Sequence, residues 1–206
     1  MNETDIINTP WRDRGYLPHL EHQKVQVLTF RLYDSVPSRI IDEWKSQLAE
    51  ESETSSKSDL IKQIKKQIDQ YEDSGHGQCF LRNKDVAKVV EDTLLYGNGK
   101  IYKLISWCVM PNHVHVMIEI LNDTPVSNIV KQWKSFSAHQ ANKILNRQGK
   151  FWMREYFDRY VRDMEHYNNA IKYIDHNPIK AGLTQFIGDW RWSSAYHMLH
   201  TDGQTD

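Results

Sequence analysis

The sequence is poor in cysteine and lacks a long apolar run. Only Cys79 and Cys108 occur among 206 residues, and no C-x-x-C pair is present. Two cysteines exclude a disulfide framework and make a thiolate zinc site improbable. No stretch of about 18 apolar residues exists, so we expect no membrane-spanning helix. The start, MNETDIINTPWRDRGYLPHLE, has no apolar segment typical of secretion signals, so we expect a cytoplasmic protein.

The sequence also lacks a surplus of positive charge. Its 26 Lys and Arg residues stand against 27 Asp and Glu residues, and the formal net charge is -1. Proteins that bind nucleic acids are usually more basic, so the average charge counts mildly against that function. The segment from Arg147 to Arg162 differs, because five basic and five aromatic residues alternate there with only two acidic ones. This mixture suits phosphates and stacked bases, although a half-buried strand with a charged face explains it slightly better.

The composition provides enough material for one folded domain. Hydrophobic residues make up 39% of the chain and aromatic residues 11%, which is sufficient for a hydrophobic core. We expect a single domain over residues 1–206, with a polar N-terminal arm over 1–23. A helical insertion is expected at about 51–75, where the polar segment EESETSSKSD precedes apolar residues at helical spacing.

Hydrophobic periodicity predicts a mixture of strands and helices. The predicted strands cover 24–33, 101–110, 113–120 and 151–161, and Pro111-Asn112 joins the middle two as a hairpin. The predicted helices cover 37–50, 60–73, 83–96, 124–144 and 163–176, with a short one in WRWSSAYHML. We expect Asn177-Pro178 to end helix 163–176, because proline disfavours helical geometry in the residue before it. An antiparallel hairpin among mixed elements indicates the α+β class.

The second strand of the hairpin carries a histidine pair, His113-Val114-His115. Alternate residues of a strand point to one face, so both imidazoles project together and can converge on one metal ion. Chance alone gives roughly half of one H-x-H pair in a chain with this histidine content, so two merely hydrogen-bonded histidines remain a serious alternative. The other face of the strand is apolar throughout, so we expect that face to join the main core: Val114, Val116, Ile118 and Ile120.

A third metal ligand must come from another element, because Glu119 lies roughly 13 Å along the strand from His115. Helix 163–176 offers one, since Tyr173 and Asn177 lie one turn apart on the same face. Tyr173 lies beside the apolar stripe of the helix, where its hydroxyl can reach a cleft. For a tyrosine considered alone, a core position with its hydroxyl in water is the simpler interpretation.

Several segments together resemble a known family. YIDHNPIKAGL, with MPNHVHVMIEI upstream, is similar to the single-tyrosine HUH transposases of the IS200-like superfamily, and above all to the REP-associated tyrosine transposases. RGYLPHLE, WKSFSAHQANKIL, FWMREYFDRYVRD and WRWSSAYHM resemble the matching segments in the same order. The likeness runs from about residue 11 to 198, and it excludes the polar stretch near 51–73.

The resemblance implies a ferredoxin-like (RRM-like) antiparallel sheet with helices on one side. It implies that His113 and His115 bind a divalent metal, Mg²⁺ or Mn²⁺, and that Tyr173 is the nucleophile. Asn177 would complete the metal site, where related insertion-sequence transposases carry the longer Gln. The implied substrate is single-stranded DNA with REP-type hairpins, cut through a 5′-phosphotyrosine, and the implied location is the nucleoid in the cytoplasm.

We expect basic residues of three regions to contact the DNA: Arg12, Arg14, Lys134, Arg154 and Arg159. Imidazoles must be neutral to bind metal, so the affinity for the ion is expected to fall as the pH drops through about 6.5. Three other functions stay open: a transposase-derived DNA-binding regulator without cleavage, a metal phosphoesterase in which water attacks, and an RNA-binding module of RRM-like fold. RNA-binding modules of this fold usually carry a K/R-G-F/Y-G/A-F-V-x-F/Y segment, and this sequence has none.

Overall fold

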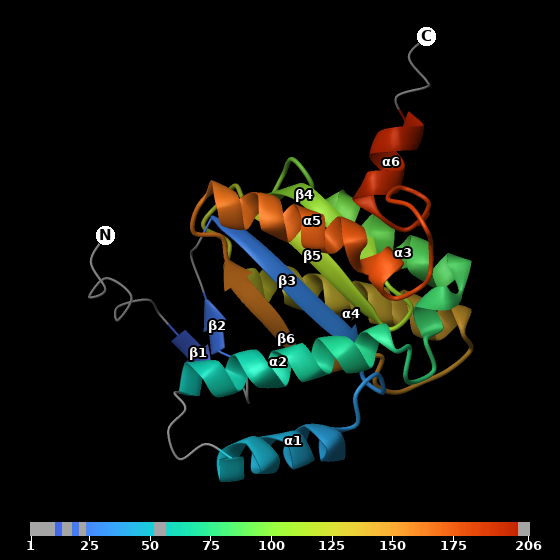
Figure 1. The fold of residues 1–206 in the computed structure, drawn as a ribbon. Coiled ribbons are helices and arrows are strands. Elements are labelled where there is room, and N and C mark those ends of the chain that lie inside the picture. Colours follow the sequence, from blue (N-terminus) through green and yellow to red (C-terminus); the bar gives the residue numbers. More distant parts are fainter. Residues whose placement is uncertain (1–10, 14–17, 21–23, 52–56, 202–206) are drawn as a thin grey trace.

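The computed structural model of the chain describes residues 11–13, 18–20, 24–51 and 57–201. Its centre is a four-stranded antiparallel sheet with the strand order β4-β5-β3-β6 (Figure 1). The strands are β3 (Val25–Leu32), β4 (Tyr102–Val109), β5 (His113–Ile120) and β6 (Trp152–Tyr160). With helices between the first and second and between the third and fourth strands, this is the βαββαβ order of a ferredoxin-like fold. The predicted α+β class and antiparallel sheet are confirmed.

Each helix expected from the sequence is present. They are α1 (Ser38–Glu51), α2 (Lys57–Asp73), α3 (Lys84–Tyr96), α4 (Val126–Ile144), α5 (Met164–Lys180) and α6 (Ser194–Thr201). The N-terminal arm contains a small antiparallel pair that was not among the predicted strands, β1 (Trp11–Asp13) and β2 (Pro18–Leu20). A single turn of 3₁₀ helix, Phe80–Arg82, precedes α3.

Helices cover both faces of the sheet. On one face α3 and α4 pack on the main core, which includes Val114 and Val116 of β5 as expected. On the other face α5 lies across the strands (Figure 1). Ile174 of α5 and Met117 of β5 belong to the apolar cluster buried there. The expectation of helices on one side is therefore wrong. The second face also carries apolar side chains of three strands, and these must be covered as well: Val27, Cys108 and Met117, with Met110 just after β4.

Helix α5 continues through its proline and ends at Lys180. Asp163 caps the start of the helix, since its side chain accepts a hydrogen bond from the backbone N–H of His166 at 2.7 Å. The predicted end at Asn177 is wrong. A proline removes only the hydrogen bond that its own N–H would donate, and the backbone N–H of Ala181 still bonds to the Asn177 carbonyl at 2.9 Å. Asn177 therefore keeps helical geometry.

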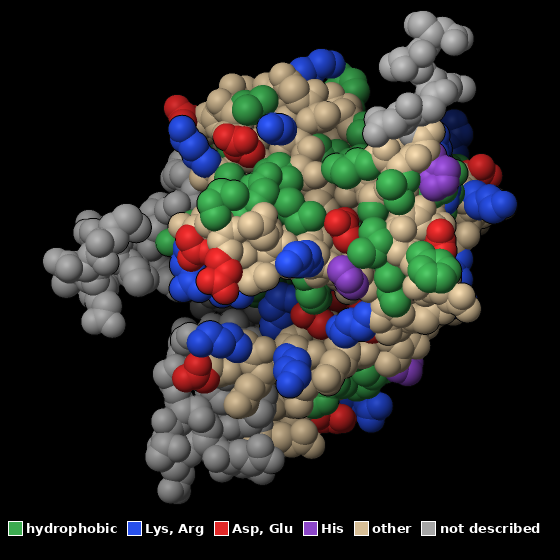
Figure 2. Space-filling view, turned by 45° about the horizontal axis from the view of Figure 1, so that its top comes forward, with side chains coloured by type: hydrophobic (Ala, Val, Ile, Leu, Met, Phe, Trp, Pro, Cys, Tyr) green, Lys and Arg blue, Asp and Glu red, His purple; other side chains and the backbone are tan. Residues whose placement is uncertain are grey.

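The surface carries both signs of charge. Basic and acidic side chains are intermixed on the face shown in Figure 2, in agreement with the formal net charge of -1. Within the described ranges, no helix is both long and apolar enough to cross a membrane.

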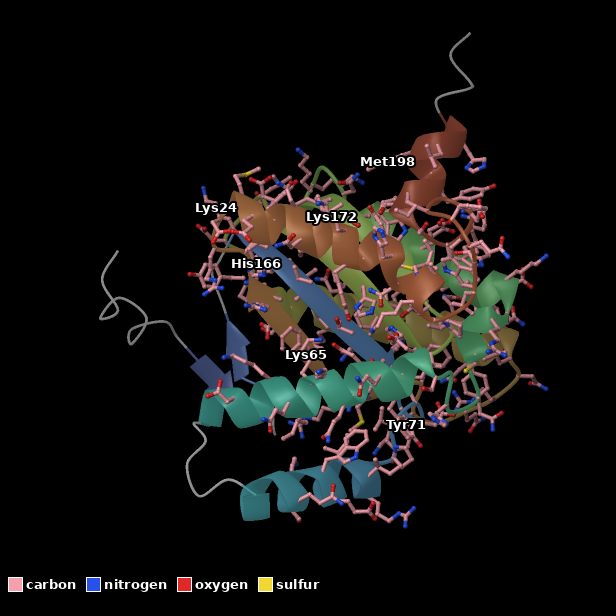
Figure 3. All side chains as sticks on the ribbon, in the orientation of Figure 1. Lys24, Lys65, Tyr71, His166, Lys172 and Met198 are labelled. Carbon is pink, nitrogen blue, oxygen red and sulfur yellow. The ribbon has the colours of Figure 1, made fainter. Side chains whose placement is uncertain are left out.

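Helix α2, the predicted insertion, runs alongside the sheet near β3 and β6 (Figure 1). One side of it packs on α1 in a small apolar cluster that includes Ile41, Ile64 and Ile68. Lys65 and Tyr71 leave the helix on opposite sides (Figure 3): the Lys65 ammonium lies over the Phe157 ring of β6, whereas Tyr71 faces α1. Helix α2 therefore contacts α1 with one side and the sheet with another.

Candidate metal and nucleophile site

The two histidines of β5 face one another. Their Nε2 atoms are 2.9 Å apart, and both side chains are almost completely buried on the sheet face opposite the main core. Two neighbouring ligand atoms of an octahedral ion, each roughly 2.1 Å from the metal, are separated by roughly 3 Å. The spacing of His113 and His115 therefore matches two ligands of a single ion.

Hydrogen bonds on the far side of each ring orient these imidazoles. The Asn112 amide donates from Nδ2 to the carbonyl of Glu72 in the last turn of α2, at 3.1 Å, and to that of His76 in the following turn, at 2.9 Å. Its Oδ1 must therefore be the acceptor for His113 Nδ1 at 2.8 Å. His113 thus carries its proton on Nδ1 and has a lone pair at Nε2. The Nδ1 atom of His115 lies 2.9 Å from Thr29 Oγ1. Such partners hold metal-binding histidines in position.

Burial keeps both imidazoles neutral. Desolvation, followed by the nearby Lys65 charge, lowers the pKa of His113 to about 3. Desolvation, followed by the charge of His113, also lowers the pKa of His115. The neutral form is the one that binds metal. Removal from water disfavours the imidazolium, so both pKa values lie below the ordinary histidine value on which the expected pH dependence was based.

Tyr173 reaches the pair from α5. Its ring stands edge-on to the His115 imidazole, with centroids 5.3 Å apart and an interplanar angle of 79°. Its hydroxyl donates a long hydrogen bond of 3.4 Å to Oδ2 of Asp69 on α2. Burial raises the pKa of Tyr173 above its ordinary value, and the charges of Asp69 and Asp73 raise it further. The phenol is therefore protonated in this arrangement and must lose its proton to act as a nucleophile.

Asn177 lies one turn after Tyr173. Its Nδ2 donates to the Tyr173 carbonyl at 2.7 Å, but its Oδ1 has no hydrogen-bond partner although the residue is only 1% exposed. A buried oxygen without a partner is costly, and a cation would satisfy it. Across the residues that the structure describes, no group of three or more His, Cys, Asp or Glu is arranged to hold an ion. An amide oxygen and two imidazoles are nevertheless donor types that suit a divalent cation.

Helix α2 contributes three carboxylates near the pair, which the sequence analysis did not identify: Asp69, Glu72 and Asp73. Asp73 Oδ1 lies 4.0 Å from His113 Nε2, and Asp73 Oδ2 lies 2.6 Å from Nζ of Lys180 on α5. Glu72 is buried 3.6 Å from Arg31 Nε, and desolvation raises its pKa to about 8. Glu72 and Asp73 follow Asp69 by three and four residues, and residues at this spacing share one face of a helix. This spacing was the pattern in the sequence that could have identified the three carboxylates.

The Lys134 side chain forms hydrogen bonds within the protein. Its half-buried ammonium donates to three consecutive backbone carbonyls of β6, residues 153–155, at 3.0, 3.2 and 3.1 Å. Desolvation lowers its pKa to about 7. All three ammonium protons have acceptors within the protein, so we do not include Lys134 in the proposed DNA-binding surface.

The other four expected DNA contacts lie elsewhere. Arg154 and Arg159 are exposed on β6, the edge strand of the sheet. Arg12 is the central residue of β1, paired with His19 of β2. Arg14 lies outside the described residues.

The residues of this site lie in a part of the chain that matches a known protein family. Residues 81–177 match the family described as "Transposase IS200 like". The matched segment includes both histidines, Tyr173 and Asn177, but it does not include α2. A Haemophilus influenzae protein assigned as a REP-associated tyrosine transposase is 23% identical over 106 residues, which is 45% of this chain and 58% of that protein. The aligned part therefore spans little more than half of this relative.

One solved structure shows the same fold, and a second gives only a weak match. A structure described as a REP-associated tyrosine transposase bound to a REP hairpin superposes with a TM-score of 0.55 at 14% identity, over 91% of this chain and 86% of the other. A transposase candidate from Deinococcus radiodurans R1 gives a TM-score of 0.33 at 14% identity, over 81% and 96% of the chains, which is too low to carry an argument. The resemblance to the IS200-like, REP-associated tyrosine transposases is therefore confirmed, and the family match covers residues 81–177.

Proposed function

We propose that this protein is a metal-dependent transposase that cuts single-stranded DNA at REP-type hairpins and holds the new 5′ end on Tyr173. One observation carries the proposal: Tyr173 of α5 contacts the imidazole of His115, whose Nε2 faces that of His113. The family match over these residues supports a DNA-cleaving function, and the hairpin bound to a structural relative supports the substrate class. Such an enzyme would work at the nucleoid in the cytoplasm.

His113, His115 and Asn177 would hold Mg²⁺ or Mn²⁺. When bound, a divalent cation polarises the scissile phosphate and offsets the negative charge that develops on it. The chain itself keeps the two Nε2 atoms turned toward each other, through the hydrogen bonds of Asn112 and Thr29. The buried setting also strengthens charge interactions at the reacting phosphate.

Tyr173 would attack the scissile phosphorus through its hydroxyl oxygen. The new bond between this oxygen and phosphorus forms as the bond between phosphorus and the 3′ oxygen breaks. The phenol proton passes to Asp69, which already accepts its hydrogen bond, and the departing 3′ oxygen takes a proton from solvent. The products are a 5′-phosphotyrosine and a free 3′-hydroxyl. One phosphodiester replaces another, so the step is reversible and permits joining to a second strand.

The DNA would reach this site along β6 and the N-terminal arm. Arg154 and Arg159 are exposed on β6, and Arg12 lies in β1, so they are the candidates for phosphate contacts. Phosphate contacts give affinity and salt dependence, whereas hairpin shape and unstacked bases give selectivity.

Mass spectrometry after incubation with Mn²⁺ and suicide hairpin substrates tests the proposal. We expect a species heavier by the mass of the attached strand, with the added mass located on Tyr173. Hairpin binding without cleavage would instead identify a DNA-binding regulator. Cleavage without an adduct would identify a phosphoesterase that uses water. Either result would overturn the proposed function.

A further inference from the structure

Positive charge is concentrated in one segment that the proposed function uses only in part. Residues 124–154, which form α4 and the start of β6, contain six Lys and Arg residues and no Asp or Glu. Lys134 is bonded to β6, and Arg154 already belongs to the proposed DNA-binding surface. Three others lie at the end of α4 and in the loop that follows: Lys143, Arg147 and Lys150. This end of α4 is therefore a candidate for binding an anion.

An open pocket of about 370 Å³ lies at this end of α4, and its size is within the range of ligand sites. Lys143 and Arg147 are among its lining residues, and none of the described residues that line it is acidic. The Lys143 side chain is exposed, whereas that of Arg147 is half-buried. A pocket that combines two cations with amide groups, and has no carboxylate, complements the charge of a phosphate group.

The loop after α4 holds Arg147 in a fixed position. Its guanidinium donates from Nη1 to Oδ1 of Asn142 at 3.0 Å and from Nη2 to the carbonyl of Lys150 at 3.1 Å. The same group lies 4.7 Å from the centre of the Phe80 ring, and Asn142 donates to the Gly149 carbonyl at 3.0 Å. These bonds use two of the five N–H groups of a guanidinium, so the group is oriented in advance and has further donors for an anion.

The cations are not required to cap α4. Backbone N–H groups of residues 145–147 already bond to three of its last four carbonyls, those of residues 141–143, at 2.9 to 3.2 Å. The side chains of Lys143 and Lys150 are exposed, so both can reach a ligand.

An exposed aromatic ring adjoins the cations. Tyr33, directly after β3, is 46% exposed, and the Lys150 ammonium lies 4.9 Å from the centre of its ring. Proteins bind single-stranded nucleic acid through this combination, because the bases stack on the ring while the phosphates pair with the cations. The bases of a duplex are already stacked on one another, so the combination fits an unpaired strand better than the stem of a hairpin.

Backbone hydrogen bonds connect this surface to the histidine pair. The N–H of Tyr33 donates to the carbonyl of Phe151, and the N–H of Leu32 donates to that of Asn112, both at 2.8 Å. Asn112 precedes His113 and orients its ring. Neighbouring strands are roughly 4.8 Å apart, so the loop after α4 lies two strand spacings, roughly 10 Å, from the start of β5. A single strand can therefore contact both places.

We propose that Tyr33, Lys143, Arg147 and Lys150 form a flank site, which binds the unpaired flank of the hairpin DNA. The three cations bind phosphates of the flank, and Tyr33 stacks on one of its bases. The inference rests on the proposed function, because it names the part of the proposed substrate that this surface takes. It adds a second DNA-binding surface to the one on β6 and the N-terminal arm.

Fluorescence anisotropy with two labelled DNAs tests the flank site. One probe is a REP-type hairpin with a single-stranded flank of about 10 nucleotides, and the other is the same hairpin without the flank. Both are measured in EDTA, so that binding is observed without cleavage. The variants change exposed side chains and leave Arg147 in place, because Arg147 also holds the loop.

Loss of two cations should weaken binding of the flanked probe alone. We expect Lys143→Gln/Lys150→Gln to bind the flanked hairpin about fivefold more weakly or worse, and the bare hairpin within about twofold of the unaltered protein. On the flanked probe, the slope of log affinity against log salt should fall in magnitude by between about 1 and 2. Lys103→Gln/Lys131→Gln removes the same charge from exposed positions of β4 and α4, and should bind both probes normally.

Replacement of Tyr33 tests stacking. We expect Tyr33→Ala to weaken binding of the flanked hairpin about fivefold or more, whereas Tyr33→Phe, which keeps the ring, should bind normally. On a probe whose flank lacks bases, Tyr33→Ala should bind as well as the unaltered protein, because no base remains to stack.

The outcomes separate the possible partners. Equal losses on both probes would show that the surface binds the hairpin stem, and losses on neither would show that it binds no DNA; each result would overturn the inference. Tighter binding of an RNA flank than of the matching DNA flank would identify RNA as the partner, and would overturn it too.

The adduct on Tyr173 decides the proposed function separately. An adduct in the unaltered protein, with no effect of the flank-site variants, would overturn this inference and leave the proposed function intact. Losses confined to the flanked probe, in a protein that forms no adduct, would support the flank site and overturn the proposed function.

Discussion

The phenol ring of Tyr173 stands edge-on to the imidazole of His115, with ring centroids 5.3 Å apart. The tyrosine belongs to α5 and the histidine to β5, so packing of a helix on the sheet brings the two together. This contact places the proposed nucleophile beside the two proposed nitrogen ligands. Holding reacting groups in one place lowers the entropic part of a reaction barrier, and this is the main chemical advantage of the arrangement.

Removal of the Tyr173 hydroxyl should abolish the covalent adduct. We expect Tyr173→Phe to form no protein–DNA adduct and to bind hairpin DNA within about twofold of the unaltered protein, because the ring and its packing remain. Denaturing gels measure the adduct and filter binding measures the affinity. Tyr167→Phe, which removes a hydroxyl from another half-buried tyrosine of α5, should keep full activity. An adduct in Tyr173→Phe would exclude this residue as the nucleophile.

Loss of either imidazole should block cleavage. We expect His113→Ala and His115→Ala each to lower the cleavage rate about 100-fold or more, because each removes one of two convergent nitrogen ligands. EDTA should have the same effect on the unaltered protein, and added Mn²⁺ should reverse it. The control is His139→Ala, at an exposed position of α4, which should cleave normally. Undiminished cleavage in EDTA would exclude a metal from the reaction.

The hydroxyl of Thr29 should tune metal affinity without contacting the ion. Thr29→Val keeps the shape of the side chain but removes the hydrogen-bonding partner of His115 Nδ1. Loss of such a partner typically weakens metal binding by about 10-fold to 100-fold, and we expect a Mn²⁺ dissociation constant about tenfold higher. Thr93→Val, which removes a buried hydroxyl of α3 bonded to the Val89 carbonyl, should leave Mn²⁺ binding unchanged. Equal affinities of the two variants would contradict the prediction.

Glu72 should make stability fall as the pH rises. Burial raises the pKa of Glu72 from 4.5 to about 8, so between these values the folded protein holds a proton that the unfolded chain has lost. The contribution of Glu72 to stability is therefore fully present below pH about 4.5 and is lost as the pH rises through about 8.

The neutral variant Glu72→Gln should lack this pH dependence. We expect its free energy of unfolding to exceed that of the unaltered protein by a few kcal/mol at pH about 8, and by much less at pH about 5. Denaturant unfolding at both pH values measures the difference. A difference that does not grow with pH would show that Glu72 is ionised throughout in the folded protein.

Arg154 and Arg159 should contribute phosphate contacts. We expect the double variant Arg154→Ala/Arg159→Ala to bind hairpin DNA more weakly, and the slope of log affinity against log salt to fall in magnitude by between about 1 and 2. Both residues are exposed on β6, whereas Lys103 is exposed on β4 at the opposite edge of the sheet. Lys103→Ala should therefore leave the slope unchanged. An unchanged slope in the double variant would place the DNA on another surface.

Short-range patterns in the sequence determined the elements and the faces of their residues. Alternation along β5 assigned Val114 and Val116 to the main core and the two histidines to the opposite face, because the repeat of a strand is fixed by its backbone. Helical spacing placed Tyr173 and Asn177 one turn apart for the same reason. The likeness of these segments to the IS200-like transposases then identified which side chains to consider together.

Only the tertiary structure decided which elements meet. It placed α5 on the second face of the sheet, kept Asn177 helical through Pro178, and engaged the Lys134 ammonium with the carbonyls of β6. It also brought Asp73 to within 4.0 Å of His113. Residue spacing fixes geometry only over a few positions, whereas these contacts depend on packing and desolvation across the whole fold. The sequence therefore determined the parts of the site, and long-range packing decided how they come together.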